Sequence, residues 1–536
     1  METVAQLYQG LERLNDIGAS LSSERDLGRL LEKILLAAKD ITHADGGTLY
    51  LVSEDRQRLH FEIVHTDSLH IAFGGTSGAP ISSKFPDLPL YGDDGAPNNG
   101  MVAAYAALTG RTVNIEDAYA AEGFDFSGTR RFDANTGYRS QSFLTVPMKN
   151  HEGEIIGVLQ LINAIDPETG AVAAFPETDQ RLAESLASQA AIALTNRQLI
   201  QQMEDLFESF IKLINTAIDE KSPYTGGHCQ RVPVLTMLLA EAADAATEGP
   251  LADFKLTDKD RYELKIAALL HDCGKVTTPV HVVDKATKLQ TLFDRIALID
   301  TRFEVLKRDA EIAMLKDVAA GAPRGEAECR LAERVARLDD DRAFLRQANI
   351  GSERMSDDDI ARVQRIGREY RWRNPNGDTV PFLSDDELEN LTIRAGTLTR
   401  AEREIINHHI VATIKMLEQL PWPKHLRNVP EYAGGHHERM DGKGYPRGLK
   451  REQMSWQARM MGIADIFEAL TAKDRPYKEG MKLSQALGIL EKFRDNGHID
   501  PDLLGVFLRG QVYVRYAEAF LDAGQVDMGC RGMPNE

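Results

Sequence analysis

Hydrophobic and polar residues alternate in four segments of the first third of the chain. The segments are 47–55, 58–67, 143–150 and 155–163. Alternation of this kind predicts β-strands with one face toward a core, and Glu152 with Gly153 predicts a hairpin turn between the last two. Helical patterns over 1–22 and 26–44 precede the strands. Helices beside a mainly antiparallel sheet make an α+β domain, which we expect here.

A continuous helical pattern then runs from Glu177 to Glu220. Its second half carries an apolar seam with alternating steps of four and three residues, formed by Leu199, Met203, Leu206, Phe210, Leu213 and Ala217. This a/d spacing is typical of a coiled coil, so we expect a homodimer through this connector helix, which would transmit a shift of helix register to the next domain. The alternative is that the seam packs against its own domain. Pro223, Gly226 and Gly227 end the pattern.

Beyond this break, helical patterns resume at 228–246 and 262–276, and two long charged ones follow at 288–317 and 327–349. The last two predict an antiparallel helical hairpin inserted at about 286–398. Such a hairpin could cover a site, bind a partner, extend a dimer or simply be a solvated insertion.

Composition and charge narrow the class of protein. The chain has 536 residues, of which 43% are apolar and 27% charged, and this indicates a soluble protein of two or three domains. A formal net charge of -19 disfavours a nucleic-acid polymer as a partner. No 18 apolar residues run together, and no CxxC pair occurs among Cys229, Cys273, Cys329 and Cys530. We therefore expect a cytoplasmic protein with no membrane partner and no disulfide framework.

Candidate metal ligands gather in the second half of the sequence. His271 and Asp272 directly follow the apolar helix face of 262–270. Asp465 lies in a strongly apolar helix, where an unpaired carboxylate would be costly to bury. The complete donor set is His228, His271, Asp272, His408 or His409, His436, His437 and Asp465. Imidazole and carboxylate donors without thiolates favour iron or manganese over structural zinc, and one carboxylate can bridge two ions.

Three of the segments that contain these donors carry a resemblance. HDCGK from His271, HHERMDGKGYP from His436 and ADIFEALTAKDRPY from Ala464 resemble the HD-GYP domain, a branch of the HD phosphohydrolase superfamily that is similar to cyclic di-GMP phosphodiesterases. The resemblance covers about 204–290 and 398–500 and implies an all-α domain. It also implies two divalent metal ions, iron or manganese, which activate a bridging hydroxide against a phosphodiester.

The same resemblance distributes the ligands between the two ions. One would be held by His228, His271, Asp272 and Asp465, and Asp272 would bridge to a second held by His409, His436 and His437. His409 is preferred over His408 by its place in the family pattern. Tyr224 replaces a glutamate that helps some members to hold a third ion.

Further roles follow from the resemblance for residues around the ions. Lys275 would act with His271 and Asp272 and reach the scissile phosphate. Tyr445 would stack on a guanine or bond to phosphate, and Arg475 with Lys478 would clamp the other phosphate. A group in the glycine-rich loop would order that loop, namely Glu438, Arg439 and Asp441. Cys273 is expected to pack and not to ligate.

Residues 25–195 are similar to the GAF domains of cyclic-nucleotide phosphodiesterases and cyclases, which look like small-molecule sensors. Asn163, Phe175 and Asp179 match residues that recur in the phosphodiesterase subset, whereas Ala164 and Gln180 depart from it. The resemblance implies a small-molecule or cyclic-nucleotide ligand; a dimerisation and regulatory module without a ligand is the alternative.

The expected architecture is therefore multidomain. It comprises an N-terminal helix (1–24), an α+β GAF sensor (25–195), a coiled-coil connector (196–222), an all-α HD-GYP domain with its helical insertion (223–510) and a C-terminal tail (511–536). Three functions stay open: a phosphodiesterase that converts cyclic di-GMP to pGpG and onward to GMP, the same chemistry on another cyclic dinucleotide such as 3',3'-cGAMP, and a silent scaffold that senses such a nucleotide. Because every expected ligand has a candidate, the first is preferred.

Overall fold

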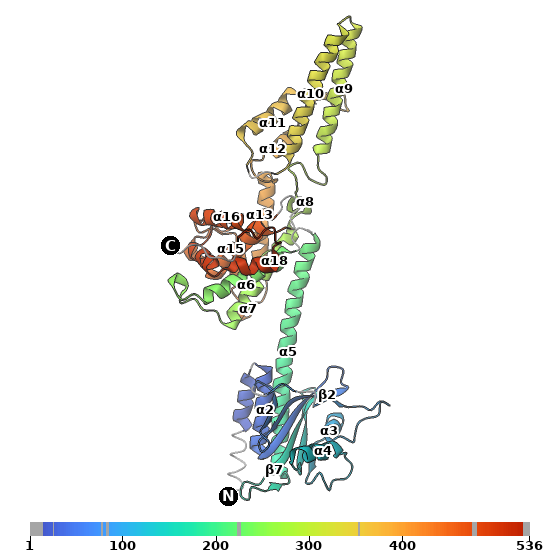
Figure 1. Cartoon of the computed structure of the whole chain (residues 1–536), viewed down its shortest axis with the longest axis vertical. Helices are drawn as coiled ribbons and strands as arrows, with labels where there is room; N and C mark the ends of the chain where they lie inside the picture. The colour runs from blue at the N-terminus through green and yellow to red at the C-terminus, as the bar shows by residue number, and fades with distance from the viewer. Residues whose placement is uncertain are drawn as a thin grey trace. The chain divides into compact units, whose positions relative to one another are not determined.

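The computed structural model describes residues 14–24, 26–76, 79–81, 85–221, 227–351, 354–473 and 480–528. The chain divides into two compact units, an N-terminal unit over 1–207 and a C-terminal unit over 208–536. Each unit has its own core, and the N-terminal unit is the α+β one (Figure 1).

One antiparallel sheet organises the N-terminal unit, with the strand order β3-β2-β1-β7-β6-β5; β4 pairs with β2 and β8 with β7. The strands are β1 (Ala44–Val52), β2 (Arg58–Thr66), β3 (Ile71–Gly74), β4 (Leu88–Pro89), β5 (Val113–Ile115), β6 (Phe143–Lys149), β7 (Ile155–Ile165) and β8 (Val172–Ala173). The four strands predicted from alternation are confirmed as β1, β2, β6 and β7. The predicted turn is confirmed as well: Gly153 has a φ of 81°, and Asn150 Oδ1 accepts from the backbone N–H of Glu152 and Glu154.

Helices cover both faces of this sheet (Figure 1). The helix α2 (Leu27–Thr42) and the first half of α5 pack on one face, in a core that includes Ile34, Leu161 and Leu186. The helix α3 (Val102–Thr109) packs on the other face, where Ala104 meets Val158, and α4 (Ser127–Thr136) lies further along the chain.

The helix α5 (Glu177–Lys221) is a single helix of 45 residues, which confirms the continuous helical pattern. Its first half is buried against the sheet, whereas the predicted seam is exposed: Met203 is 71% exposed and Leu213 62% exposed. Within the described residues, therefore, the seam is not covered by its own domain. Of the residues predicted to break the helix, Pro223 and Gly226 lie outside the described residues, and Gly227 is the N-cap of the next helix, which begins at His228 as predicted.

The C-terminal unit is a cluster of helices around a common centre (Figure 1). They are α6 (His228–Asp244), α7 (Asp258–Leu270), α8 (Val280–Val283), α13 (Arg400–Glu418), α14 (Val429–Gly434), α15 (Trp456–Thr471), α16 (Leu483–Asp495), α17 (Pro501–Arg509) and α18 (Val512–Phe520), with 3-10 turns η1 (Gly249–Leu251), η2 (Cys273–Thr277), η3 (Lys424–Leu426) and η4 (Arg451–Gln453). Side-chain caps fix several starts: Thr257 caps α7, Thr399 caps α13 and Ser455 caps α15.

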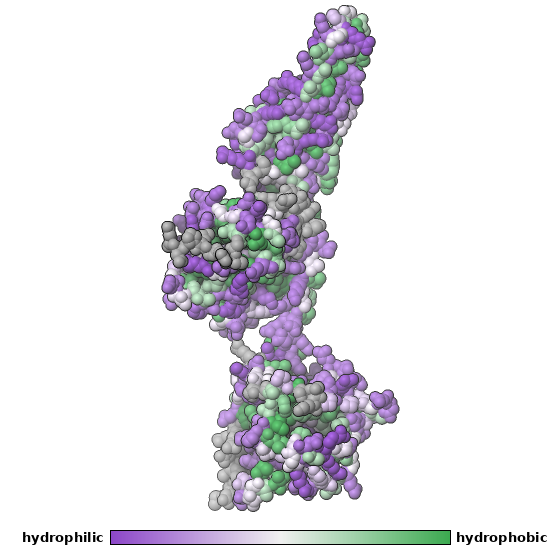
Figure 2. Space-filling model, viewed as in Figure 1, coloured by the Kyte–Doolittle hydropathy of each residue, from purple (hydrophilic) through white to green (hydrophobic). Residues whose placement is uncertain are grey.

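The insertion contains the predicted hairpin and more. The helices α9 (Ile296–Ala319) and α10 (Arg324–Asn349) pack together, and Arg342 joins Asp300 and Glu304 across them. The prediction missed the elements that follow, which are α11 (Asp357–Glu369), β9 (Arg371–Arg373), β10 (Thr379–Pro381) and α12 (Asp385–Leu391). They share a small core with the base of the hairpin, centred on Phe303 and Phe382. Figure 2 shows hydrophilic side chains over much of the visible face of the hairpin.

The two ends of the insertion are joined at its root by a buried lysine. Lys285 is 2% exposed, and its Nζ donates to Glu402 (2.7 Å) and to Asn390 Oδ1 (2.8 Å). Because an unpaired buried ammonium is costly, these bonds hold the insertion to the start of α13. Among the described helices, none has the length and apolar character needed to cross a membrane.

Candidate metal centre

The candidate ligands lie at helix ends or within apolar helices that converge on one point. His228 begins α6, His271 and Asp272 follow α7, and His409 lies on α13. His436 and His437 follow α14, and Asp465 lies on α15. Contacts of α6 with α7 and α15, and of α14 with α7, α13 and α15, bring these residues together.

The first three donors form one group. Ligand atoms of His228, His271 and Asp272 all lie within 4.8 Å of one another, and all three residues are buried. Asp465 joins them, because its Oδ1 lies 3.2 Å from His228 Nε2. A group of buried imidazole and carboxylate donors is suited to a divalent transition metal.

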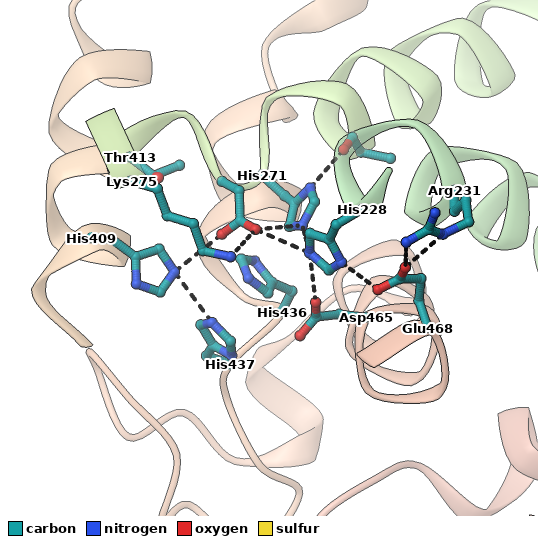
Figure 3. Close-up of polar contacts among 12 residues, drawn as sticks. His228, Arg231, His271, Lys275, His409, Thr413, His436, His437, Asp465 and Glu468 are labelled. Carbon is teal, nitrogen blue, oxygen red and sulfur yellow. Dashed lines mark hydrogen bonds and ion pairs between the residues drawn. The ribbon is translucent and has the colours of Figure 1, made fainter. Parts of the chain in front are cut away.

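A second group is formed by His409, His436 and His437, whose donor atoms also lie within 4.8 Å of one another. Asp272 faces both groups: Oδ2 lies 3.2 Å from His271 Nε2, and Oδ1 lies 3.2 Å from His409 Nε2. Figure 3 shows the labelled imidazoles of the two groups close together. The structure thus brings all seven sequence-predicted donors together. It places His409 inside and leaves the neighbouring His408 exposed.

Unpaired buried atoms indicate that this centre fits metal ions. Among the described residues, Asp272 Oδ1 and His436 Nε2 are buried without a hydrogen-bond partner, which is costly unless another group satisfies them. Three imidazoles are held from behind by the backbone carbonyl three residues earlier: His271 by Ala268 (2.7 Å), His409 by Ile406 (2.5 Å) and His436 by Ala433 (2.6 Å). Each therefore presents Nε2 to the centre.

Electrostatics favour the protonation states that a metal requires. Burial lowers the pKa of His437 to about 4 and that of His436 well below its usual value, so both rings are neutral. Burial alone would raise the pKa of Asp272, but the charge of Lys275 and the neighbouring imidazoles hold it well below the usual range. Neutral imidazole and ionised carboxylate are the forms that ligate metals.

Two predicted substrate residues border the centre. Lys275 Nζ lies 2.6 Å from Asp272 Oδ2, and the Tyr445 ring stacks on His437 with 4.8 Å between ring centroids. Tyr445 precedes a cis peptide bond to Pro446. Arg475 and Lys478 lie outside the described residues.

The glycine-rich loop is ordered by a buried carboxylate. Glu438 is 4% exposed and accepts from the backbone N–H of Arg447 (2.7 Å) and of Leu449 (2.8 Å). Arg439 pairs with Asp441 at 2.8 Å near the other side of the loop. These contacts agree with the ordering role predicted for Glu438, Arg439 and Asp441. They fold the loop back on itself, so that Tyr445 returns to His437.

Close backbone contact joins the two halves of the centre. A Cβ on Gly274 would lie 2.0 Å from the His409 carbonyl oxygen, so only glycine fits between η2 and α13. The Gly274 N–H donates to Thr413 Oγ1 at 2.9 Å. Cys273, the residue before it, is 2% exposed and belongs to neither donor group, in line with the packing role predicted for it.

Sequence reasoning missed three polar residues that support the ligands: Glu468, Arg231 and Thr413. Glu468 lies three residues after Asp465, and Arg231 three residues after His228, so each shares a helix face with a ligand. A charged residue one turn from a ligand on an otherwise apolar helix is the signal that could have found the first two. Thr413 carries no such signal, because its role depends on the approach of η2.

The three GAF-domain candidates are not brought together around a cavity in the described residues. Asn163 is buried, and its amide bonds to the backbone of Arg139, Gln141 and Ser142. Phe175 belongs to the core, and Asp179 lies near the start of α5. These contacts account for Asn163 as a support of the sheet, and a ligand role for the three remains a prediction.

Comparison with known families assigns models to most of the chain. The model described as GAF domain matches residues 26–194, and two models described as HD domain match 225–342 and 361–503. The two HD matches are not two separate centres, because their donors meet at Asp272 and His409.

Curated relatives agree with these models. A 3'3'-cGAMP-specific phosphodiesterase of Vibrio cholerae is 25% identical over 59% of this chain and 42% of its own length. A cyclic di-GMP phosphodiesterase of Pseudomonas aeruginosa is 34% identical over 25% of this chain and 31% of its own length. The matches thus span less than half of either relative. Among solved structures, the GAF domain of an Acinetobacter phosphoenolpyruvate-protein phosphotransferase is 18% identical over 36% of this chain and 98% of that chain, with a TM-score of 0.26.

Proposed function

For this chain, which carries a GAF domain followed by an HD phosphohydrolase region, we propose a metal-dependent phosphodiesterase of the HD-GYP type that hydrolyses cyclic di-GMP. The main observation in support is that Asp272 joins the two donor groups. Tyr445 of the Gly-Tyr-Pro segment stacks on His437 of the second group. The products would be pGpG and, after a second cleavage, GMP.

Two ions of iron or manganese fit the groups, since the donors are nitrogen and oxygen atoms without thiolate. When bound, such a pair supplies an activated water and stabilises the charge that develops on the phosphodiester. His271 and Asp272 would hold the ions, and Lys275 would bind the phosphate undergoing attack. Tyr445 would stack against a guanine, and Arg475 with Lys478 would hold the second phosphate.

The test is chromatography of cyclic di-GMP incubated with anaerobically purified protein, together with metal analysis. We expect about two ions per chain and release of pGpG. The double substitution His271→Ala and Asp272→Ala should abolish both. A matched pair sharpens the test: His409→Ala should lose turnover, whereas His408→Ala, one residue away on the exposed face of α13, should keep it. Equal effects of these two substitutions would contradict the assignment.

The second candidate substrate is 3',3'-cGAMP, and it is favoured by the Vibrio cholerae relative, whose match is the longer of the two. Competition between the two nucleotides in one reaction would measure the ratio of their kcat/KM values. A protein that binds cyclic di-GMP and metal without hydrolysing either nucleotide would instead support the silent scaffold.

We further propose that the chain forms a homodimer through α5. The seam is apolar and exposed over at least three turns, with Leu206 57% and Phe210 56% exposed, and its a/d spacing matches a second copy of itself. A dimer would let a small ligand of the GAF domain control the HD region through the same helix.

A further inference from the structure

His228 is held differently from the three imidazoles of the centre that rest on backbone carbonyls. His271, His409 and His436 each rest on the backbone carbonyl three residues earlier. His228 is the first residue of α6, so no earlier turn of this helix can supply such a carbonyl. Its Nδ1 instead lies 2.5 Å from Glu468 Oε2.

Glu468 is itself fixed in place. Its side chain is 0% exposed, and Arg231 donates to Oε1 from Nε (2.8 Å) and from the guanidinium NH2 group (2.7 Å), as Figure 3 shows. Glu468 lies one turn beyond Asp465 on α15, and Arg231 lies one turn beyond His228 on α6. The two helices that carry these ligands are therefore bonded to each other directly behind the metal centre.

The consequence for His228 follows from the chemistry of the two groups. An ionised carboxylate only accepts hydrogen bonds, so the ring nitrogen that faces it carries the proton. A neutral imidazole with a proton on Nδ1 has its lone pair on Nε2. That atom lies 3.1 Å from Asp272 Oδ2 and 3.2 Å from Asp465 Oδ1, inside the first donor group. These carboxylates also attract a proton to Nε2, so Nε2 becomes a ligand when a bound cation takes the place of that proton, while Nδ1 keeps its own proton against Glu468.

We propose that Glu468, held by Arg231, is a positioning residue that selects Nε2 of His228 as the metal donor and thereby sets the metal affinity of the first group. The inference rests on the proposed metal-dependent function and adds residues that control it. The second group, formed by His409, His436 and His437, does not touch Glu468 in the described contacts and is expected to be unaffected.

Glu468→Gln is the informative substitution. It preserves the size of the side chain, but the amide can donate to Nδ1 and so permits the tautomer whose Nε2 carries a proton and cannot ligate. We expect affinity at the first group to fall roughly 10- to 100-fold. Arg231→Met leaves the bond between Glu468 and His228 in place, so the loss should be smaller. Glu387→Gln is the control, since Glu387 is 3% exposed and paired with Arg302 at 2.7 and 2.8 Å, within the insertion.

The experiment uses full-length protein stripped by a chelator and titrated anaerobically with Mn²⁺, with bound metal counted after equilibrium dialysis. Electron paramagnetic resonance distinguishes a coupled pair of Mn²⁺ ions from a single one. Wild type and Glu387→Gln should bind two coupled ions, and Glu468→Gln should bind one ion tightly with an uncoupled signal.

Three outcomes would overturn the inference. The first is a Glu468→Gln protein that binds two coupled ions as tightly as wild type. The second is an Arg231→Met protein whose first donor group loses more than about 100-fold in Mn²⁺ affinity, since a residue that only supports a ligand costs less than that. This outcome can be tested even if Glu468→Gln fails to fold. The third is wild-type protein that binds no Mn²⁺ at all, which would refute the proposed function and this inference with it.

Discussion

Gly274→Ala is expected to separate the two halves of the metal centre while leaving the protein folded. The added Cβ would lie 2.0 Å from the His409 carbonyl oxygen and 2.5 Å from the Thr413 backbone nitrogen. Ordinary contact begins at 3.4 Å, so η2 and α13 must move apart by about 1.4 Å. Both obstacles are backbone atoms of a helix, which cannot turn aside as a flexible side chain would.

That displacement is large for a metal site. Ligand distances are set within about 0.2 Å, and a misplacement of about 1 Å can cost roughly 100-fold in rate. Asp272 lies two residues before Gly274, and its Oδ1 faces His409 Nε2 at 3.2 Å, so the shift acts on the carboxylate shared by both groups. We expect turnover to fall at least 100-fold, with an overpacking cost of about 1–3 kcal/mol in stability.

The assay combines turnover of cyclic di-GMP, metal content and urea unfolding. Gly325→Ala is the matched control, because Gly325 lies in the first turn of α10 with nothing within 4 Å of its added Cβ. This control should keep full activity and gain up to about 1 kcal/mol in stability. A Gly274→Ala enzyme with wild-type turnover and two bound ions would refute the reasoning that close approach of η2 and α13 builds the centre.

Three further predictions concern other parts of the chain. Burial lowers the pKa of Lys288 from 10.5 to about 8. The unfolded chain therefore binds this proton more tightly, so the free energy of unfolding is reduced below pH 8 and recovers as the pH rises toward 10.5. Lys288→Met should raise the free energy of unfolding at pH 7 by up to about 3 kcal/mol. In urea unfolding at pH 9 the increase should be about 1 kcal/mol smaller. Leu206→Glu should convert the proposed dimer to a monomer, as measured by light scattering, whereas Gln201→Glu, which lies off the seam, should leave the dimer intact. An unchanged mass for Leu206→Glu would contradict the proposed coiled coil. Glu438→Gln should weaken two buried hydrogen bonds to the loop that contains Tyr445. The free energy of unfolding should fall by about 1–3 kcal/mol and KM should rise. An unchanged KM would show that the loop is ordered without the Glu438 carboxylate.

Local patterns in the sequence were enough to predict the elements and the candidate donors. Alternation identified β1, β2, β6 and β7, and the seven donors stand out because they are histidines and aspartates at the ends of helices, within helices or in the glycine-rich loop. The sequence did not reveal the small core of the insertion, because that core joins residues from separate elements between Leu289 and Leu391. It also missed Glu468, whose partner His228 lies 240 residues away in the chain.

The sequence by itself determined the order of the domains, the helical periodicity of the connector and the chemical type of the centre, because these depend on residue identity and on spacing along a single element. Only the tertiary structure decided which donors share a group, that Asp272 faces both groups, and that Glu468 and Arg231 stand behind His228. The physical reason is that these relations arise from contacts between α6, η2, α13 and α15, which are set by the packing of helices far apart in the chain. Gly274 illustrates the difference: the sequence shows a glycine, and the fold shows that a single carbon atom there would meet the backbone of a metal-ligand histidine.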